Sequence, residues 1–221
     1  YIADKYSSDY NWKTLGGSSE LAYTALSTWS GMAKDSVAPL TSYNSVKFQS
    51  ISSSQCYNDT LTIENAEYLY SIAEVKQAIM DHGAVTADYY HNNKYLGSDK
   101  RSYFCEKSTA ANHAITIVGW DNSYSRFKFD GAGSFWPDGD GAWICQNSWG
   151  SNWADGGYFY ISYYDVNLSD PIYYDVQKAD TYTYNYQYDG TGNPNCKIVS
   201  LGTSFVNFYT SKGASKERLD A

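Results

Sequence analysis

The 221-residue sequence has little positive charge. It holds 16 Lys and Arg against 24 Asp and Glu, which gives a formal net charge of −8, and it contains no basic run. Nucleic acids and anionic membranes attract clustered basic side chains, so we expect neither as a partner. No apolar run approaches the ~18–20 residues of a transmembrane helix, so no membrane span is expected.

The first residues also lack the pattern of a signal peptide, although in a fragment that absence would say nothing about secretion. Cysteines are few: Cys56, Cys105, Cys145 and Cys196. An even number permits two disulfides without requiring them. Cys145 lies in a predicted strand, where we expect a buried, small apolar residue. Cys105 lies on a predicted loop and is open to bridging.

Tyrosine, by contrast, is abundant, with 24 residues, and hydrophobic residues make up 43% of the chain. That is enough for a sizeable core, and the length suits one domain with part of another. Tyrosine side chains offer large amphipathic surfaces, which are common where proteins meet other polymers.

Two apolar segments, residues 113–118 and 142–147, are typical of buried strands. The first begins with His113 and the second ends with Asn147. An Asn-His pair alone is weak evidence of a site. If neighbouring strands bring the two side chains together, the asparagine oxygen can accept from one imidazole N–H. That contact would fix the tautomer and leave the second nitrogen to face a nucleophile.

The order of the motifs is more specific. Asn-His-Ala at 112–114 is followed by Val-Gly-Trp at 118–120, Asn-Ser-Trp-Gly at 147–150 and Gly-Gly-Tyr-Phe-Tyr-Ile at 156–161. In these motifs the sequence resembles the papain-like cysteine peptidases, from the glycine pair at 16–17 to about Asp175. The long 121–141 loop is similar to the clostridial branch of that family. The resemblance implies an α+β fold of two subdomains with an antiparallel, barrel-like sheet.

By this resemblance, His113 is the general base partner of a cysteine, Asn147 orients it and Trp149 covers the Asn–His contact. The family's nucleophile segment, of the type Cys-Gly-Ser-Cys-Trp, does not occur in the sequence, nor does the glutamine that precedes it. We therefore expect an upstream segment or a companion chain to supply the cysteine. Cys145 is a less favoured candidate, because it lies on a strand rather than at a thiolate-stabilising helix N-terminus.

The resemblance also suggests residues that contact substrate. Gly16 and Gly17 would form a cleft wall whose bare backbone pairs with an extended peptide, although a plain turn before a helix explains them too. Asn112 stands where many family members carry Asp, so we expect an altered pH profile rather than lost activity. Asp88 or Tyr89 would border the pocket for the second substrate residue before the cut.

Two helices are predicted, near residues 18–30 and 72–82. Ser71 and Glu74 form a capping box for the second, and Gly83 ends it. Its apolar residues are spaced as one buried face: Ile72, Val75 and Ile79.

The other two histidines are expected to be structural. His82 falls in the last helical turn, where the helix dipole favours a cation. His91 lies among Asn and Lys residues in a predicted turn, and we expect it to be solvated. The acidic, glycine-rich loop at 121–141 raises a calcium hypothesis, since hard oxygen ligands suit that ion. An ordinary surface loop is favoured, and we expect no cofactor and no metal.

The predicted domains are residues 1–178, a papain-like peptidase domain, and residues 179–221. The second segment resembles the start of a lectin-like β module; the alternative is a β-rich tail. The predicted function is a cysteine endopeptidase acting on proteins or peptides, outside the cell or at its surface. The alternative is a catalytically inactive papain-like binding or adhesion module of a bacterial surface protein. Contact with cell wall or carbohydrate is compatible with either.

Overall fold

The computed structural model describes residues 18–27, 34, 36, 61–131, 135–179, 181–184, 210 and 212–213. The chain divides into two compact units, Asn65–Asp175 and a second that combines Tyr1–Glu64 with Val176–Ala221. Gly16, Gly17 and most of the predicted 179–221 module lie outside the described residues. The unit Asn65–Asp175 carries the candidate site.

Two α-helices are described, and both were predicted. Helix α2, Ser19–Ser27, belongs to the unit that combines the chain ends, and helix α4 spans Ile72–His82. The Ser71 hydroxyl caps α4 by accepting from Glu74 N–H at 3.2 Å, and the Glu74 carboxylate accepts from Tyr70 N–H at 2.7 Å. Gly83 ends the helix with a φ of 92°, a conformation that suits glycine.

The buried face of α4 differs in part from the prediction. Val75, Ala78 and Ile79 are buried, whereas Ile72 is 44% exposed. This face is centred on Val75, so Ile72 falls at its edge and the prediction for that residue is wrong.

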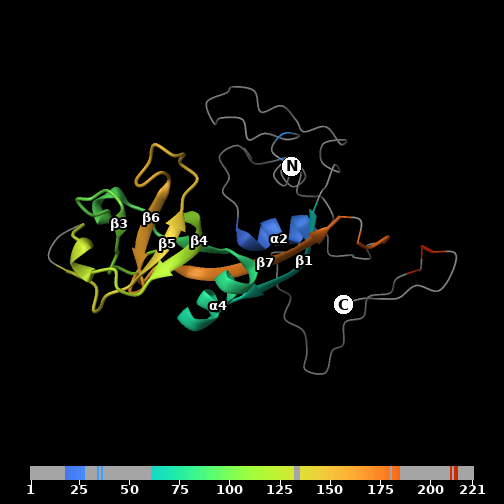
Figure 1. The fold of residues 1–221 in the computed structure, drawn as a ribbon, viewed down its shortest axis with the longest axis horizontal. Helices are drawn as coiled ribbons and strands as arrows, with labels where there is room; N and C mark the ends of the chain where they lie inside the picture. The colour runs from blue at the N-terminus through green and yellow to red at the C-terminus, as the bar shows by residue number, and fades with distance from the viewer. Residues whose placement is uncertain are drawn as a thin grey trace. The chain divides into compact units, whose positions relative to one another are not determined.

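Seven strands form one sheet in the order β1-β7-β2-β4-β5-β6-β3. Figure 1 shows β4, β5 and β6 next to one another in this sheet. Their bounds are β1 Leu61–Tyr68, β2 Val85–Tyr89, β3 Ser102–Tyr103, β4 His113–Asp121, β5 Ala142–Gln146, β6 Tyr158–Ser162 and β7 Ser169–Lys178. Two short 3₁₀ helices, η1 Asn93–Tyr95 and η2 Arg126–Lys128, lie in the connections.

The sheet is mostly antiparallel, and its centre is built from the predicted strands. β4 runs antiparallel to both β2 and β5, and β5 runs antiparallel to β6. The predicted antiparallel pairing does not hold at one edge, where β3 pairs parallel with β6. Parallel neighbours need a long connection, which here runs through β4 and β5.

The core of the Asn65–Asp175 unit lies between α4 and the sheet. Alternate residues of β2 and β4 face it, including Val85, Ala87, Ile115 and Ile117, and join the buried side chains of α4. Tyr89, Tyr103 and Phe159 extend this cluster as fully buried rings. The large aromatic side chains thus reach from the core to the end of the sheet where β4 begins.

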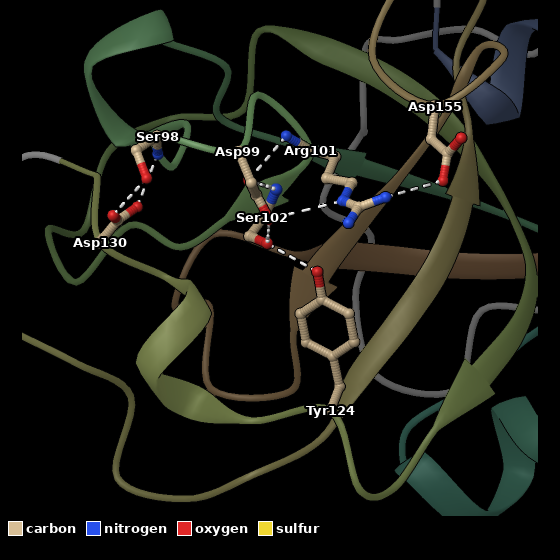
Figure 2. A network of polar contacts seen from close by, with 7 residues as sticks. All are labelled: Ser98, Asp99, Arg101, Ser102, Tyr124, Asp130 and Asp155. Carbon is tan, nitrogen blue, oxygen red and sulfur yellow. Dashed lines mark hydrogen bonds and ion pairs between the residues drawn. The ribbon is translucent and has the colours of Figure 1, made fainter.

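A polar network ties the 97–102 turn to the rest of the unit (Figure 2). The fully buried Ser102 hydroxyl donates to Asp99 and lies 2.7 Å from the Tyr124 hydroxyl. Ser98 donates its N–H and its hydroxyl to Asp130, both at 2.6 Å. An ion pair of 3.2 Å joins Arg101 to Asp155. These seven residues are called the Asp99 network below: Ser98, Asp99, Arg101, Ser102, Tyr124, Asp130 and Asp155.

Candidate active site

His113 and Asn147 meet at one end of the sheet. His113 is the first residue of β4, and Asn147 directly follows β5, the antiparallel neighbour of β4. Because neighbouring antiparallel strands begin and end at the same edge, the two side chains are brought together. His113 Nε2 lies 2.9 Å from Asn147 Oδ1, within the ~2.6–3.2 Å expected of a catalytic hydrogen bond.

The partners of Asn147 indicate the tautomer of His113. Asn147 Oδ1 also accepts from the backbone N–H of Ser148 at 2.8 Å. A backbone N–H can only donate, so the shared atom is the amide oxygen, and His113 must carry a proton on Nε2. Nδ1 of the neutral ring is then the basic nitrogen, and no described residue forms a hydrogen bond with it. The arrangement offers a base on one side of an oriented imidazole.

Asn147 is itself held in place by the loop that follows it. Its N–H donates to Gly157 O at 2.9 Å, and its side chain is buried. Gly157 has a φ of 92° and packs so close to Gly150 that a Cβ would lie 3.2 Å from the Gly150 oxygen. Within the described part of the chain, Asn147 Nδ2 is the one buried side-chain polar atom without a hydrogen-bond partner.

Trp149 stacks on the imidazole of His113. The two ring centroids are 4.7 Å apart and the planes differ by 26°. Trp153 contacts Trp149 edge-on, with ring centroids 4.9 Å apart, and also packs against the buried Phe159. Trp149 is 41% exposed, so it forms a partly open wall over His113.

The prediction that His91 is a solvated turn residue is wrong. Its ring is half-buried, 6.2 Å from the ring of His113 and 4.6 Å from that of Trp149. A signal for this position was present in the sequence. β2 and β4 are antiparallel, with Tyr89 opposite His113, so a residue just past β2 lies beside the start of β4. His82, as expected, lies elsewhere: it is 3.2 Å from the Asp175 carboxylate and stacks on Tyr173.

Of the other residues predicted to contact substrate, the structure describes Asn112, Asp88 and Tyr89 but not Gly16 and Gly17. The side-chain amide of Asn112 accepts from His91 N–H at 2.7 Å and donates to His91 O at 3.1 Å, so it holds the backbone of the neighbouring loop. Tyr89 is fully buried, whereas Asp88 is partly exposed. Burial and the charge of Asp170 raise the pKa of Asp88, and the charge of His113 opposes that shift.

Neither described cysteine lies at the site. Cys145 is fully buried and pairs with Ile117, well along β4 from His113, and burial raises the pKa of its thiol. Cys105 is buried and free rather than bridged, and its backbone N–H donates to Asp165 at 2.8 Å. Cys56 and Cys196 lie outside the described residues.

The acidic loop shows ordinary contacts in its described part. Asp130 is bound by Ser98, and Asp140 accepts from Arg126 N–H at 2.9 Å. Across the described residues, no group of three or more His, Cys, Asp or Glu side chains could hold a metal ion. Within the same ranges, no helix is long and apolar enough to cross a membrane.

Comparison with known proteins places the chain in a family. The model of the papain family cysteine proteases matches residues 7–175. The chain belongs to the papain family of cysteine proteases, and its fold is papain-like, with a mixed, mostly antiparallel sheet and few helices.

Individual relatives agree. Fruit bromelain from Ananas comosus is 30% identical over 90 residues, and macrodontain-1 from Ananas macrodontes is 28% identical over 151 residues. The chain spans only 20% of the first and 59% of the second.

Among solved structures, the clostridial cysteine protease Cwp84 after propeptide cleavage is 30% identical, with a TM-score of 0.66. That likeness covers 75% of this chain and 42% of Cwp84. A second Cwp84 structure, of its cysteine protease and lectin-like domains, matches with a TM-score of 0.63 over 72% of this chain. It describes Cwp84 as a surface layer associated protein of Clostridium difficile.

Proposed function

We propose that this chain provides the His and Asn of a Cys-His-Asn site in a cysteine endopeptidase that hydrolyses protein substrates. His113 is the acid–base residue and Asn147 its orienting partner. The nucleophile comes from a segment upstream of these residues. The single observation that carries the proposal is the 2.9 Å contact between His113 Nε2 and Asn147 Oδ1, which leaves Nδ1 as the basic nitrogen.

The chemistry follows from that nitrogen. His113 Nδ1 takes the thiol proton, and the thiolate attacks the peptide carbonyl to form a tetrahedral oxyanion. As the oxyanion collapses and the C–N bond breaks, the imidazolium returns its proton to the leaving amine. The product is a thioester. His113 then takes a proton from water, whose oxygen attacks the thioester and releases the acid and the thiol.

The imidazolium formed in each half-reaction is supported by the protein. Asn147 Oδ1 accepts from Nε2–H throughout, so the ring cannot turn as its charge changes. Trp149 stacks on the same ring and limits the access of water to it. A cation over an aromatic face is favourable, so this stack also suits the charged form.

The assignment of the nucleophile to another segment is supported by the described cysteines. Cys145 and Cys105 are both fully buried, and the register of β4 and β5 sets Cys145 opposite Ile117 rather than His113. A thiol whose pKa is raised by burial is a poor source of thiolate.

The setting of the protein is proposed by likeness to Cwp84. That relative is described as a surface layer associated protein with a lectin-like domain beside its protease domain. We therefore place this protein at the cell surface and propose that residues 179–221 open a lectin-like module that contacts carbohydrate of the cell wall. A longer chain that begins at residue 179 should then fold alone and bind cell-wall glycan; failure to do either would favour a β-rich tail.

A cysteine-directed epoxide tests the peptidase in the full-length protein. The reagent should label one cysteine outside the four of this sequence and should abolish peptide hydrolysis. The label should be lost in His113→Ala and kept in the control His82→Ala, because only His113 can form the ion pair that activates the thiol.

Two other outcomes would replace the proposal. A label on Cys56, Cys105, Cys145 or Cys196 would move the nucleophile into the present chain. An unlabelled protein that cleaves no peptide yet binds cell walls would identify an inactive papain-like adhesion module.

A further inference from the structure

Every polar group of His91 has a hydrogen-bond partner. Its Nδ1 lies 2.8 Å from the hydroxyl of Tyr89, and its Nε2 lies 3.0 Å from Asn93 Oδ1. Its backbone N–H and C=O both bond to the side chain of Asn112. The ring also stacks on Tyr103, with centroids 5.7 Å apart and planes 21° apart. All the polar groups of a residue just past the end of β2 are thus paired.

These contacts favour the neutral ring. Asn93 Oδ1 can only accept, so Nε2 carries the proton and Nδ1 accepts from the Tyr89 hydroxyl. Tyr89 is fully buried, and no other described residue bonds to its hydroxyl. A proton on Nδ1 would therefore leave the Tyr89 O–H hydrogen buried without an acceptor, which is unfavourable.

The fixed ring also meets the tryptophan over the candidate general base. His91 meets Trp149 edge-on, with centroids 4.6 Å apart and planes at 82°, and Trp149 stacks on His113. Edge-to-face contact is a preferred arrangement of aromatic rings. Trp153 contacts Trp149 as well, so the indole lies between two edge contacts. Since Trp149 is partly exposed, these neighbours decide where it rests.

We propose that His91 is a positioning residue of the site: as a neutral ring it holds Trp149 against His113, and when protonated it loosens that contact. The proposal rests on the proposed function for its effect on catalysis. Its structural half, the coupling of three rings, is independent of any peptidase activity.

The titratable groups that face His91 support a pH-dependent role. They are Tyr89 from β2, Tyr103 from β3 and His113 from β4. Burial raises the pKa of both tyrosines well above its ordinary value, so they stay neutral in the working range. Burial lowers the pKa of His91; the Asn93 hydrogen bond opposes this shift, and the charge of His113 adds to it.

His91 is neutral near pH 7 and becomes charged only below its ordinary range of about 6.5. The stabilisation of the neutral form is complete above that value and is lost as the pH falls through the lowered pKa. A cation at position 91 then repels the imidazolium form of His113, which the reaction needs. Activity should therefore fall on acidification partly through His91.

Substitutions separate the ring from its charge. His91→Ala removes the ring and should lower kcat/KM of the full-length enzyme about tenfold at neutral pH, mostly through kcat. His91→Phe keeps the ring edge and cannot be charged. It should retain neutral-pH activity within about threefold, and its acid limb should be shallower by one titrating group. His82→Ala is the matched control and should keep the wild-type profile.

His91→Phe leaves the Tyr89 hydroxyl without an acceptor, so His91→Phe/Tyr89→Phe is the second variant if folding suffers. Proton NMR of the imidazole Cε1–H signals gives a readout that does not depend on catalysis. The signals of the three histidines in this sequence can be assigned by substituting each in turn. The His113 signal should carry a ring-current shift from Trp149 that decreases in His91→Ala and changes at the His91 titration midpoint.

The results decide between two separate failures. A His113 signal that ignores both the His91→Ala substitution and the His91 midpoint overturns the positioning role, whatever the activity. An acid limb in His91→Phe identical to wild type also overturns it. Absence of peptidase activity in wild type, with the predicted NMR coupling intact, contradicts the proposed function while the coupling of the rings stands.

Discussion

Two polar clusters of the Asn65–Asp175 unit are built in opposite ways. In the Asp99 network, Asp99 accepts from the N–H groups of Arg101 and Ser102, both at 2.9 Å, and from the Ser102 hydroxyl (Figure 2). Around His113, by contrast, described residues form no hydrogen bond with His113 Nδ1 or Asn147 Nδ2. The hydrogen bonds of the Asp99 network hold the turn in one conformation, whereas the His113 cluster keeps two polar nitrogen atoms without a partner among the described residues.

Exposure separates the clusters as well. Ser102 is fully buried and its hydroxyl lies beside Tyr124, whose pKa burial raises to about 12. Trp149 is 41% exposed above His113. A buried group that loses a partner costs stability, because water cannot replace the partner. At an open site water can replace a lost partner, so the expected loss is in catalytic rate and not in stability. The substitutions below test this division, from the largest expected effect to the smallest.

His113→Ala should have the largest effect. In the proposed mechanism both proton transfers pass through this ring, so kcat/KM of the full-length protein should fall by about three orders of magnitude or more. The free energy of unfolding should change little, since the ring is only partly buried. Steady-state kinetics and urea unfolding measure the two quantities. His82→Ala, at the end of α4, is the control, and equal damage there would refute the site.

Asn147→Ala should come second. It frees the ring of His113 but removes no proton-transfer group, so the loss in kcat/KM should be about two orders of magnitude or less. The substitution removes Nδ2, which has no partner among the described residues, and Oδ1, which accepts from the Ser148 N–H. Because Ser148 is exposed, water can replace that acceptor, so the free energy of unfolding should change little. A large loss of stability with normal kinetics would show that Asn147 belongs with the structural cluster.

Ser102→Ala should show the reverse pattern. It leaves the Tyr124 hydroxyl without its partner inside the protein and removes one of the hydrogen bonds that Asp99 accepts. A buried polar group left unpaired costs about 1–3 kcal/mol, so the free energy of unfolding should fall by that amount. Peptidase kinetics at a temperature where the variant is folded should match wild type. Altered kcat would mean that the Asp99 network also shapes the site.

The sequence predicted the cluster around His113 better than the Asp99 network, for physical reasons. His113 and Asn147 stand at the ends of apolar strands that their periodicity identifies, and antiparallel pairing then brings them together. The turn at 97–102 has no periodicity, and the contact of Ser102 with Tyr124 joins residues far apart in the chain. β3 has only two residues, too few to show an alternating pattern, so its parallel pairing was not predicted.

His91 shows what such reasoning misses. Its neighbours in the sequence are polar, which is typical of a solvated turn, yet rings from three other segments enclose it: Tyr103, His113 and Trp149. Only the register of β2 against β4 reveals that this turn meets the start of β4. Tertiary contacts therefore bury part of His91 in spite of its polar neighbours. Ile72 is the opposite case, an apolar residue that the tertiary structure leaves exposed.

Arg101→Gln should have the smallest effect. The guanidinium pairs with Asp155 at 3.2 Å, but the two side chains are 45% and 58% exposed, so water and salt screen the pair. The Arg101 N–H that bonds to Asp99 is backbone and survives the change. The melting temperature should move by no more than about 1 °C, and any difference should vanish in high salt. Thermal unfolding of Arg101→Gln beside Ser102→Ala measures the contrast within one network. Equal shifts in melting temperature would mean that the exposed Arg101–Asp155 pair contributes as much stability as the buried Ser102 hydroxyl. Burial would then not explain which contacts of the network stabilise the protein.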